Sequence, residues 1–169
     1  NVTADHQYYR LLTSAFLHGS ITHLGMNMLS LYWLGRFIEM VLGGWKMAAV
    51  YFVSLFAASV AVVLFSAPYV ATLGASGAIF GLFGALFAIG LKLGDRGADL
   101  VRSNIGILVL NLIFSFTFPG ISWQAHVGGL IAGFIVTYAL FWPPKPVRAV
   151  VVDSHSGAQY ESALEDPRD

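Results

Sequence analysis

Long stretches without formal charge constrain this chain more than any other feature of its sequence. Residues 11–35, 47–91 and 103–144 contain no Asp, Glu, Lys or Arg. One helical crossing of a bilayer takes ~20 apolar residues, so these stretches have room for one, two and two crossings. Only 11% of the residues are charged, whereas a soluble domain carries roughly a quarter. We therefore predict a polytopic membrane protein.

Proline and glycine divide the two longest stretches. Pro68 breaks the first of them, and the Pro119-Gly120 pair is typical of a turn in the second. The sequence thus predicts an all-α bundle with five transmembrane helices. These helices are expected near residues 22–42, 45–66, 75–92, 103–117 and 123–142.

The remaining segments lie at the two ends of the chain. Residues 1–142 form the predicted membrane domain, of which 1–21 precede the first helix. Residues 143–169 begin with a proline-rich stretch and become polar and acidic, so we expect a flexible cytoplasmic tail. Within this tail, the valine run 150–152 gives only a weak indication of strand pairing. The chain has no cysteine and a formal net charge of zero, so nothing favours a thiol nucleophile or binding to nucleic acid.

Lysine and arginine predict the orientation of the bundle. Five crossings place the two ends of the chain on opposite sides of the membrane, and the side richer in Lys and Arg faces the cytoplasm. One side has only Arg10. The other side has eight basic residues: Arg36, Lys46, Lys92, Arg96, Arg102, Lys145, Arg148 and Arg168. The helices that begin near residues 22, 75 and 123 are therefore expected to begin at the outer face.

Four polar residues interrupt the apolar helices near that outer face. His23 and Asn27 lie four residues apart on the first helix, Ser76 begins the third, and His126 lies near the start of the fifth. Polar side chains within a membrane are costly and usually face the protein interior. The topology places all four at a similar depth, so we expect them to converge.

Structural explanations compete with a catalytic one. A serine in a membrane helix often bonds its own backbone, and a lone histidine in a helix is usually structural. Small residues let membrane helices approach closely, and two such series are present. They consist of Gly77, Gly81 and Gly84 on one helix, and of Ala125, Gly129, Ala132 and Gly133 on another.

A histidine that faces a serine indicates acyl transfer, with His126 as general base and Ser76 as nucleophile. No Asp or Glu lies within a predicted helix near them, so a Ser-His dyad is expected rather than a triad. The start of a helix offers free backbone N–H groups. His23 and Asn27 can add side-chain donors for an oxyanion.

A zinc site is the rival chemistry. His18, His23 and His126 are its candidate ligands. The first two are not spaced i,i+4, and no thiol or carboxylate supports them. We therefore expect neither a metal nor another cofactor.

Three separate motifs resemble those of the rhomboid intramembrane serine proteases. The first is HLGMN, with its H-x-x-x-N pair at His23 and Asn27. The second is GASG, which places Ser76 in the nucleophile position of G-x-S-G. The third is AHVGGLIAG from Ala125, which places His126 in the position of the base. The motifs occur in the order of the family. The resemblance begins with the stretch from Tyr9 that leads into HLGMN, and it covers residues of about 9–142.

The resemblance implies a serine endopeptidase, a hydrolase that cleaves transmembrane segments of membrane proteins within the lipid bilayer. It implies that Phe80 occupies the place of an aromatic residue that supports the ring of the base. It further implies a multi-pass protein, expected in a bacterial plasma membrane, with its active site open to the outside. The family core has six helices, so the first core helix is expected to be missing from this chain.

Two other functions remain open at this point. One is a catalytically silent rhomboid-like protein that binds membrane helices without cutting them. The other is a small transporter or channel subunit, which would show a polar pathway or repeated halves. Neither feature is visible in the sequence. The identity of the substrates and the oligomeric state do not follow from it.

Overall fold

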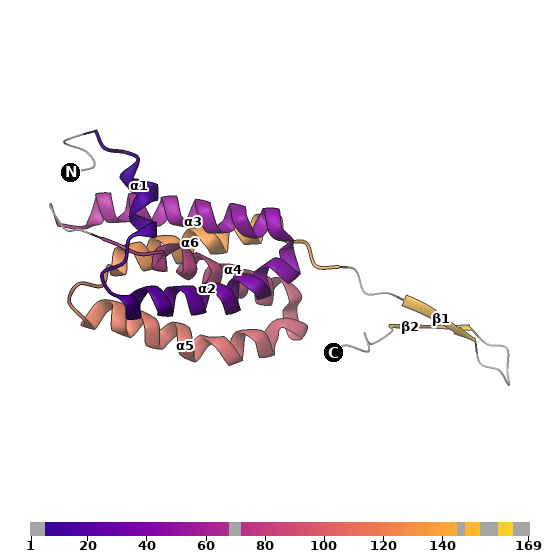
Figure 1. The fold of residues 1–169 in the computed structure, drawn as a ribbon. Coiled ribbons are helices and arrows are strands. Elements are labelled where there is room, and N and C mark those ends of the chain that lie inside the picture. The colour runs from indigo at the N-terminus through magenta and orange to yellow at the C-terminus, as the bar shows by residue number, and fades with distance from the viewer. Residues whose placement is uncertain (1–5, 68–71, 145–147, 153–158, 164–169) are drawn as a thin grey trace.

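The computed structural model describes residues 6–67, 72–144, 148–152 and 159–163, and it places five long helices in one bundle (Figure 1). These helices are α2 (Ile21–Leu42), α3 (Gly44–Phe65), α4 (Ser76–Leu93), α5 (Ala98–Thr117) and α6 (Trp123–Leu140). Three short helices accompany them: α1 (Arg10–Thr13), η1 (Ser14–Phe16) and η2 (Gly94–Gly97). The all-α membrane bundle predicted from the sequence is confirmed.

Helices α2, α4 and α6 begin at the same end of the bundle, on the left in Figure 1. Two of these starts are fixed by serine caps. The Ser20 hydroxyl accepts a hydrogen bond from the backbone N–H of His23 at 3.1 Å. The Ser122 hydroxyl accepts one from the N–H of Ala125 at 3.3 Å. A capping serine defines where a helix begins, so each cap places a histidine in the first turn or just after it.

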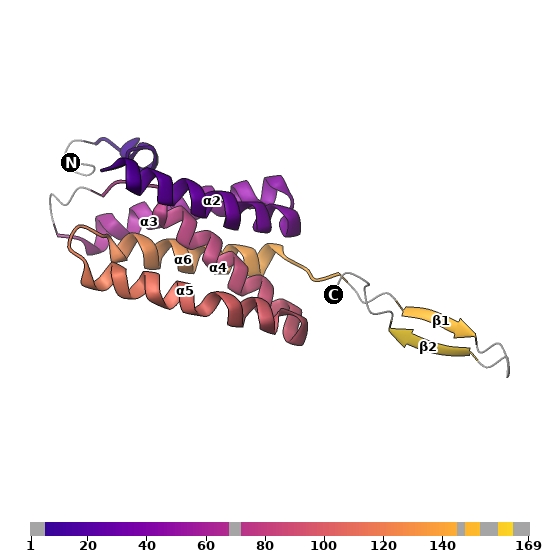
Figure 2. The ribbon, with the colours of Figure 1, turned by 60° about the horizontal axis from the view of Figure 1, so that its bottom comes forward.

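Helix α4 lies in the middle of the bundle and contacts α2, α3, α5 and α6 (Figure 2). Most of its 18 residues are buried, and Leu82, Ala85 and Ile89 are fully enclosed. Its far end is joined to α6, because the Lys92 ammonium donates a 2.7 Å hydrogen bond to the carbonyl of Phe141. The central position of α4 is what brings Ser76, its first residue, to residues of the other helices.

Three helical stretches in the described part of the chain are long and apolar enough to cross a membrane. They are Gly44–Phe65, Ser76–Thr117 and Trp123–Leu140. The 42 residues of Ser76–Thr117 include α4, η2 and α5. Helix α2 is as long as α3 but more polar, since it contains His23, Asn27, Arg36 and Glu39. The predicted count of five crossings is therefore approximate.

The structure differs from the sequence prediction in three places. Helix α1 and η1 occupy part of the segment before the first long helix, where no helix was expected. Helix α5 begins at Ala98 rather than near 103, because hydropathy marks the apolar part of a helix and misses a charged first turn. The tail contains an antiparallel pair of strands, β1 (Arg148–Val152) and β2 (Gln159–Ala163).

The strand pair corrects the low weight given to the valine run. Val150, Val151 and Val152 lie in β1 and pair with Glu161, Tyr160 and Gln159. β-branched side chains favour extended backbone, which accounts for the strand. Flexibility of residues 143–169 as a whole stays a prediction.

Candidate active site

The hydroxyl of Ser76 and the imidazole of His126 form a hydrogen bond across 50 residues of sequence. Ser76 Oγ lies 2.8 Å from His126 Nε2. His126 is buried, with 7% of its surface exposed, while Ser76 is partly exposed. A hydroxyl within hydrogen-bond reach of an imidazole nitrogen can be deprotonated as it attacks a carbonyl carbon.

The ring of Phe80 lies flat against the ring of His126. Their centroids are 4.0 Å apart and their planes are inclined by 10°. Phe80 follows Ser76 by one helical turn, so both side chains lie on the same face of α4. The stack limits how His126 can rotate while Ser76 contacts its Nε2.

The backbone before Ser76 makes a sharp turn at Gly74, whose φ of +111° disfavours any side chain. A Cβ atom at this position would lie 2.7 Å from Cε1 of His23 and 3.4 Å from Nδ2 of Asn27. Glycine therefore allows both side chains of α2 to approach the segment that leads into Ser76. Helix α4 has no side-chain cap, so its first N–H groups remain available to a ligand.

Asn27 is a buried donor that has no hydrogen-bond partner in the described part of the chain. It is 5% exposed, and its Nδ2 makes no hydrogen bond among the described residues. An unpaired buried amide is costly, and a bound group is one way in which its pairing can be completed. The ring of His23 packs edge-on against His18, with centroids 5.1 Å apart.

Four of the glycines in the two predicted packing series lie where α4 meets α6: Gly77, Gly81, Gly129 and Gly133. A Cβ on Gly129 would collide with the carbonyl of Gly77, and one on Gly133 would collide with the carbonyl of Gly81. The two backbones thus touch directly, which only glycine permits. This close approach brings Ser76 and His126, at the starts of the two helices, within hydrogen-bond distance.

Ser115 also contacts His126, and the sequence prediction missed it. Its Oγ lies 2.6 Å from Nδ1, the ring nitrogen that Ser76 does not touch. Asn111 and Ser115 are spaced i,i+4 in an otherwise apolar stretch of α5, which was a signal of a polar face. The sequence alone does not show that this face meets His126. The turn between α5 and α6 does not determine how the two helices pack against each other.

The surroundings of His126 contain hydroxyls rather than acids. Among the described residues, no carboxylate is hydrogen-bonded to its ring. Within the same residues, no three His, Asp or Glu side chains are grouped closely enough to hold a metal ion. The chemistry available at this site is therefore that of a serine and a histidine.

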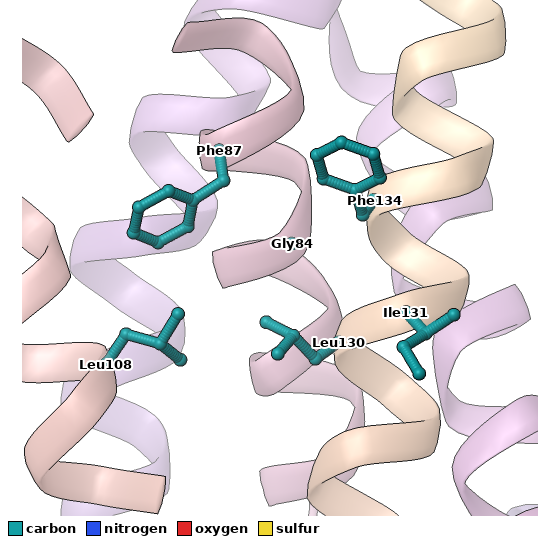
Figure 3. Close-up of a pocket in the computed structure, with 6 residues that line it drawn as sticks. All are labelled: Gly84, Phe87, Leu108, Leu130, Ile131 and Phe134. Atoms are coloured by element: carbon teal, nitrogen blue, oxygen red, sulfur yellow. The ribbon is translucent and has the colours of Figure 1, made fainter. Parts of the chain in front are cut away.

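A separate cavity of about 220 Å³ lies further along α4, between α5 and α6 (Figure 3). Its lining residues are all apolar: Gly84, Phe87, Leu108, Leu130, Ile131 and Phe134. None of them carries a nucleophile or a proton donor, so this cavity is not a catalytic candidate.

Comparison with known proteins decides the family. The Rhomboid domain model matches residues 5–143, which include all the residues of the site. The chain belongs to the rhomboid family. As expected of a rhomboid, it is an integral multi-pass membrane protein, which agrees with its apolar helices.

Several curated rhomboid relatives are similar over most of the chain. "Rhomboid protease GluP" of Bacillus subtilis is 37% identical over 144 residues, which are 85% of this chain and 28% of GluP. "RHOMBOID-like protein 4" of Arabidopsis thaliana is 32% identical over 80% of this chain and 35% of its own length. "Inactive RHOMBOID-like protein 8" of the same plant is 32% identical over 96% of this chain and 46% of its own. The chain thus spans less than half the length of each of these three relatives.

Proposed function

We propose that this rhomboid is an intramembrane serine endopeptidase that cleaves transmembrane segments of other membrane proteins. The observation that carries the proposal is the 2.8 Å hydrogen bond between Ser76 Oγ and His126 Nε2. It joins a nucleophile to a base at the start of two apolar helices. Family membership supports the proteolytic activity, because the chain is similar to a protein named a rhomboid protease.

The first half of the reaction forms an acyl-enzyme. Ser76 Oγ attacks the carbonyl carbon of the scissile bond while His126 Nε2 takes its proton. Negative charge develops on the carbonyl oxygen. The backbone N–H of Ser76 and side-chain donors of His23 and Asn27 stabilise this oxyanion. The carbon–nitrogen bond then breaks, and His126 gives the proton to the departing amine.

The second half releases the other product. A water molecule gives a proton to His126 Nε2 and attacks the acyl carbon. The bond to Ser76 Oγ breaks, and the proton returns from His126 to the serine. No metal or other cofactor takes part in this scheme. Water has to reach Ser76, which agrees with its partial exposure at the end of the bundle.

The orientation and location form part of the proposal. The end of the bundle that holds Ser76 and His126 faces the outside of a bacterial plasma membrane. The C-terminal end of α6 and residues 143–169 face the cytoplasm. The basic residues on that side support this orientation, because positive charge accumulates on the cytoplasmic side of membrane proteins.

A catalytically silent rhomboid-like protein is the alternative, since one relative is named inactive. A silent protein does not require both a nucleophile and a base. This chain has both, together with the stacked ring of Phe80 and the unpaired amide of Asn27. That combination favours catalysis over binding alone.

The test is cleavage of a transmembrane substrate by the purified chain in liposomes. We expect the wild-type protein to cut it, and Ser76→Ala and His126→Ala to lose activity by several orders of magnitude. Each variant should keep the helical circular-dichroism spectrum of the wild type. Residual cleavage by Ser76→Ala close to the wild-type rate would refute the proposal.

A metal chelator provides the control for the rival chemistry. EDTA should leave the rate unchanged, because neither step passes through a metal. Loss of activity in EDTA that added zinc restores would instead support a histidine metal site.

A further inference from the structure

Ser115 makes two short hydrogen bonds, and its single proton can serve only one of them. Its Oγ lies 2.6 Å from the backbone carbonyl of Asn111 and 2.6 Å from Nδ1 of His126. The side chain is almost completely buried, with 2% of its surface exposed. A serine hydroxyl has one donor and two acceptor positions. The direction in which Ser115 donates its proton therefore determines which nitrogen of the His126 ring carries a proton.

The carbonyl of Asn111 has no proton of its own. Two oxygens at 2.6 Å therefore require the hydroxyl proton of Ser115 between them. With this proton used, Ser115 Oγ can only accept a hydrogen bond at its other contact. His126 must then donate from Nδ1, which leaves Nε2 with its lone pair toward Ser76.

We infer that Ser115 is a positioning residue that holds His126 in the tautomer required of a general base. The inference rests on the proposed function, because the tautomer affects a rate only if His126 accepts the proton of Ser76. Ser115 occupies the place that a carboxylate occupies in a Ser-His-Asp triad. It supplies orientation without a negative charge.

The hydrogen bond persists through the reaction. When Nε2 takes the proton of Ser76, the ring becomes an imidazolium that still donates from Nδ1 to Ser115 Oγ. The proton of Ser115 stays with the carbonyl of Asn111 throughout. Ser115 therefore neither gains nor loses a proton, and the Phe80 stack and the Ser115 hydrogen bond restrain the ring together.

Helix α5 offers a matched control in Thr117. Its hydroxyl donates a 2.8 Å hydrogen bond to the carbonyl of Ile113, with the same i−4 geometry as Ser115. Thr117 is exposed. A serine or threonine that only bonds its own helix is common, and Thr117 represents that structural role.

The kinetic test uses the full chain in liposomes with one transmembrane substrate. Ser115→Ala should lower kcat by roughly 10- to 100-fold and leave KM unchanged, since a general base contributes on the order of 10²–10⁴. Ser115→Thr keeps the hydroxyl and should recover most of the rate. Thr117→Ala should match the wild type. An unchanged kcat in Ser115→Ala, or an equal loss in Thr117→Ala, would overturn the inference.

A spectroscopic test does not depend on cleavage. The chain has five histidines, and the ring ¹⁵N signals of His126 are those that disappear in His126→Asn. We expect the wild-type signals to show a protonated Nδ1 and an unprotonated Nε2, and the Thr117→Ala signals to agree. A wild-type His126 protonated at Nε2 would overturn the inference even if the protein is a protease. The expected tautomer in a protein that does not cleave would refute the proposed function and leave the assignment of protons intact.

Discussion

The imidazole of His126, whose Nε2 is hydrogen-bonded to Ser76, is stacked nearly parallel on the ring of Phe80, with the two ring centroids 4.0 Å apart. The stack comes from neighbouring turns of two helices that touch through glycine. It keeps the ring of the proposed base in one plane, so its loss should affect the rate of catalysis more than the affinity for substrate.

Replacement of Phe80 by leucine tests this arrangement. An aromatic pair contributes about 0.5–1.5 kcal/mol beyond burial, so we expect Phe80→Leu to lower kcat by roughly two- to tenfold. KM should stay close to the wild-type value. The measurement is steady-state cleavage of a transmembrane substrate in liposomes.

Phe87→Leu is the matched control for Phe80→Leu. Phe87 lies on the same helix and lines the apolar cavity (Figure 3), whose lining residues do not include His126. Both variants make the same change of side chain, but Phe80 is buried and Phe87 only partly buried, so Phe87→Leu should lower the melting temperature by no more than Phe80→Leu. An equal loss of kcat in the two variants would assign the effect to packing rather than to the stack.

Asn27→Ala tests the oxyanion assignment. Removal of one oxyanion donor typically costs on the order of 10²–10³ in rate, and several donors share the role here, so we expect a loss of kcat at the lower end. Because Nδ2 of Asn27 makes no hydrogen bond to any residue that the structure describes, its removal should cost little stability. The measurements are kcat, KM and melting temperature on the same preparation.

The split between the kinetic constants decides the role of Asn27. An interaction made only in the transition state lowers kcat and leaves KM in place. An Asn27→Ala protein with the wild-type kcat and a raised KM would assign Asn27 to substrate binding, and the oxyanion role would be abandoned.

Gly129→Ala should destabilise the bundle. The added methyl group would collide with the carbonyl of Gly77, and overpacking of this kind costs about 1–3 kcal/mol. The shift of α6 would also separate His126 from Ser76, so activity should fall together with the melting temperature. Thermal unfolding in detergent and cleavage in liposomes measure the two effects.

Gly106→Ala is the control for Gly129→Ala. Gly106 also lies within a helix, α5, but a Cβ there would meet no atom of the described residues within 4 Å. Its replacement should leave stability unchanged or raise it slightly, since alanine favours helix over glycine. Equal destabilisation by both substitutions would show that the close contact between α4 and α6 is not the cause.

Single cysteines test the orientation, because the chain has none of its own. Gly19 lies before α2 and has open space around it. Asp95 lies in η2 at the other end and is exposed. An impermeant maleimide added to intact cells should label Gly19→Cys and not Asp95→Cys, and both after lysis. The reverse pattern in intact cells would contradict the proposed orientation.

The sequence predicted the long helices well because proline, glycine and charge mark where apolar stretches end. It missed α1 and η1, since a short helix has no apolar face of its own to recognise. It placed the start of α5 too late, because the first turns of this helix carry the charges of Asp99 and Arg102. It gave too little weight to the valines of β1, whose pairing partner lies further along the chain.

The geometry of the candidate site was anticipated in part, and the roles of its residues stay predictions. The proximity of Ser76, His126 and Phe80 could be predicted from the sequence. Helix starts place Ser76 and His126 at one depth, and i,i+4 spacing places Ser76 and Phe80 on one face of their helix. Ser115 could not, since its contact with His126 depends on how α5 packs against α6. Neither hydrophobic periodicity nor motif spacing determines how one helix is rotated relative to another.

A fluorophosphonate probe tests the dyad most directly, because it forms a covalent bond only with an activated serine. The chain should be labelled in liposomes, and mass spectrometry should find the adduct on Ser76. His126→Ala should lose most of the labelling, whereas Thr117→Ala should keep it. An adduct on another serine, or equal labelling of wild type and Ser76→Ala, would contradict the account of Ser76 and His126 as nucleophile and base.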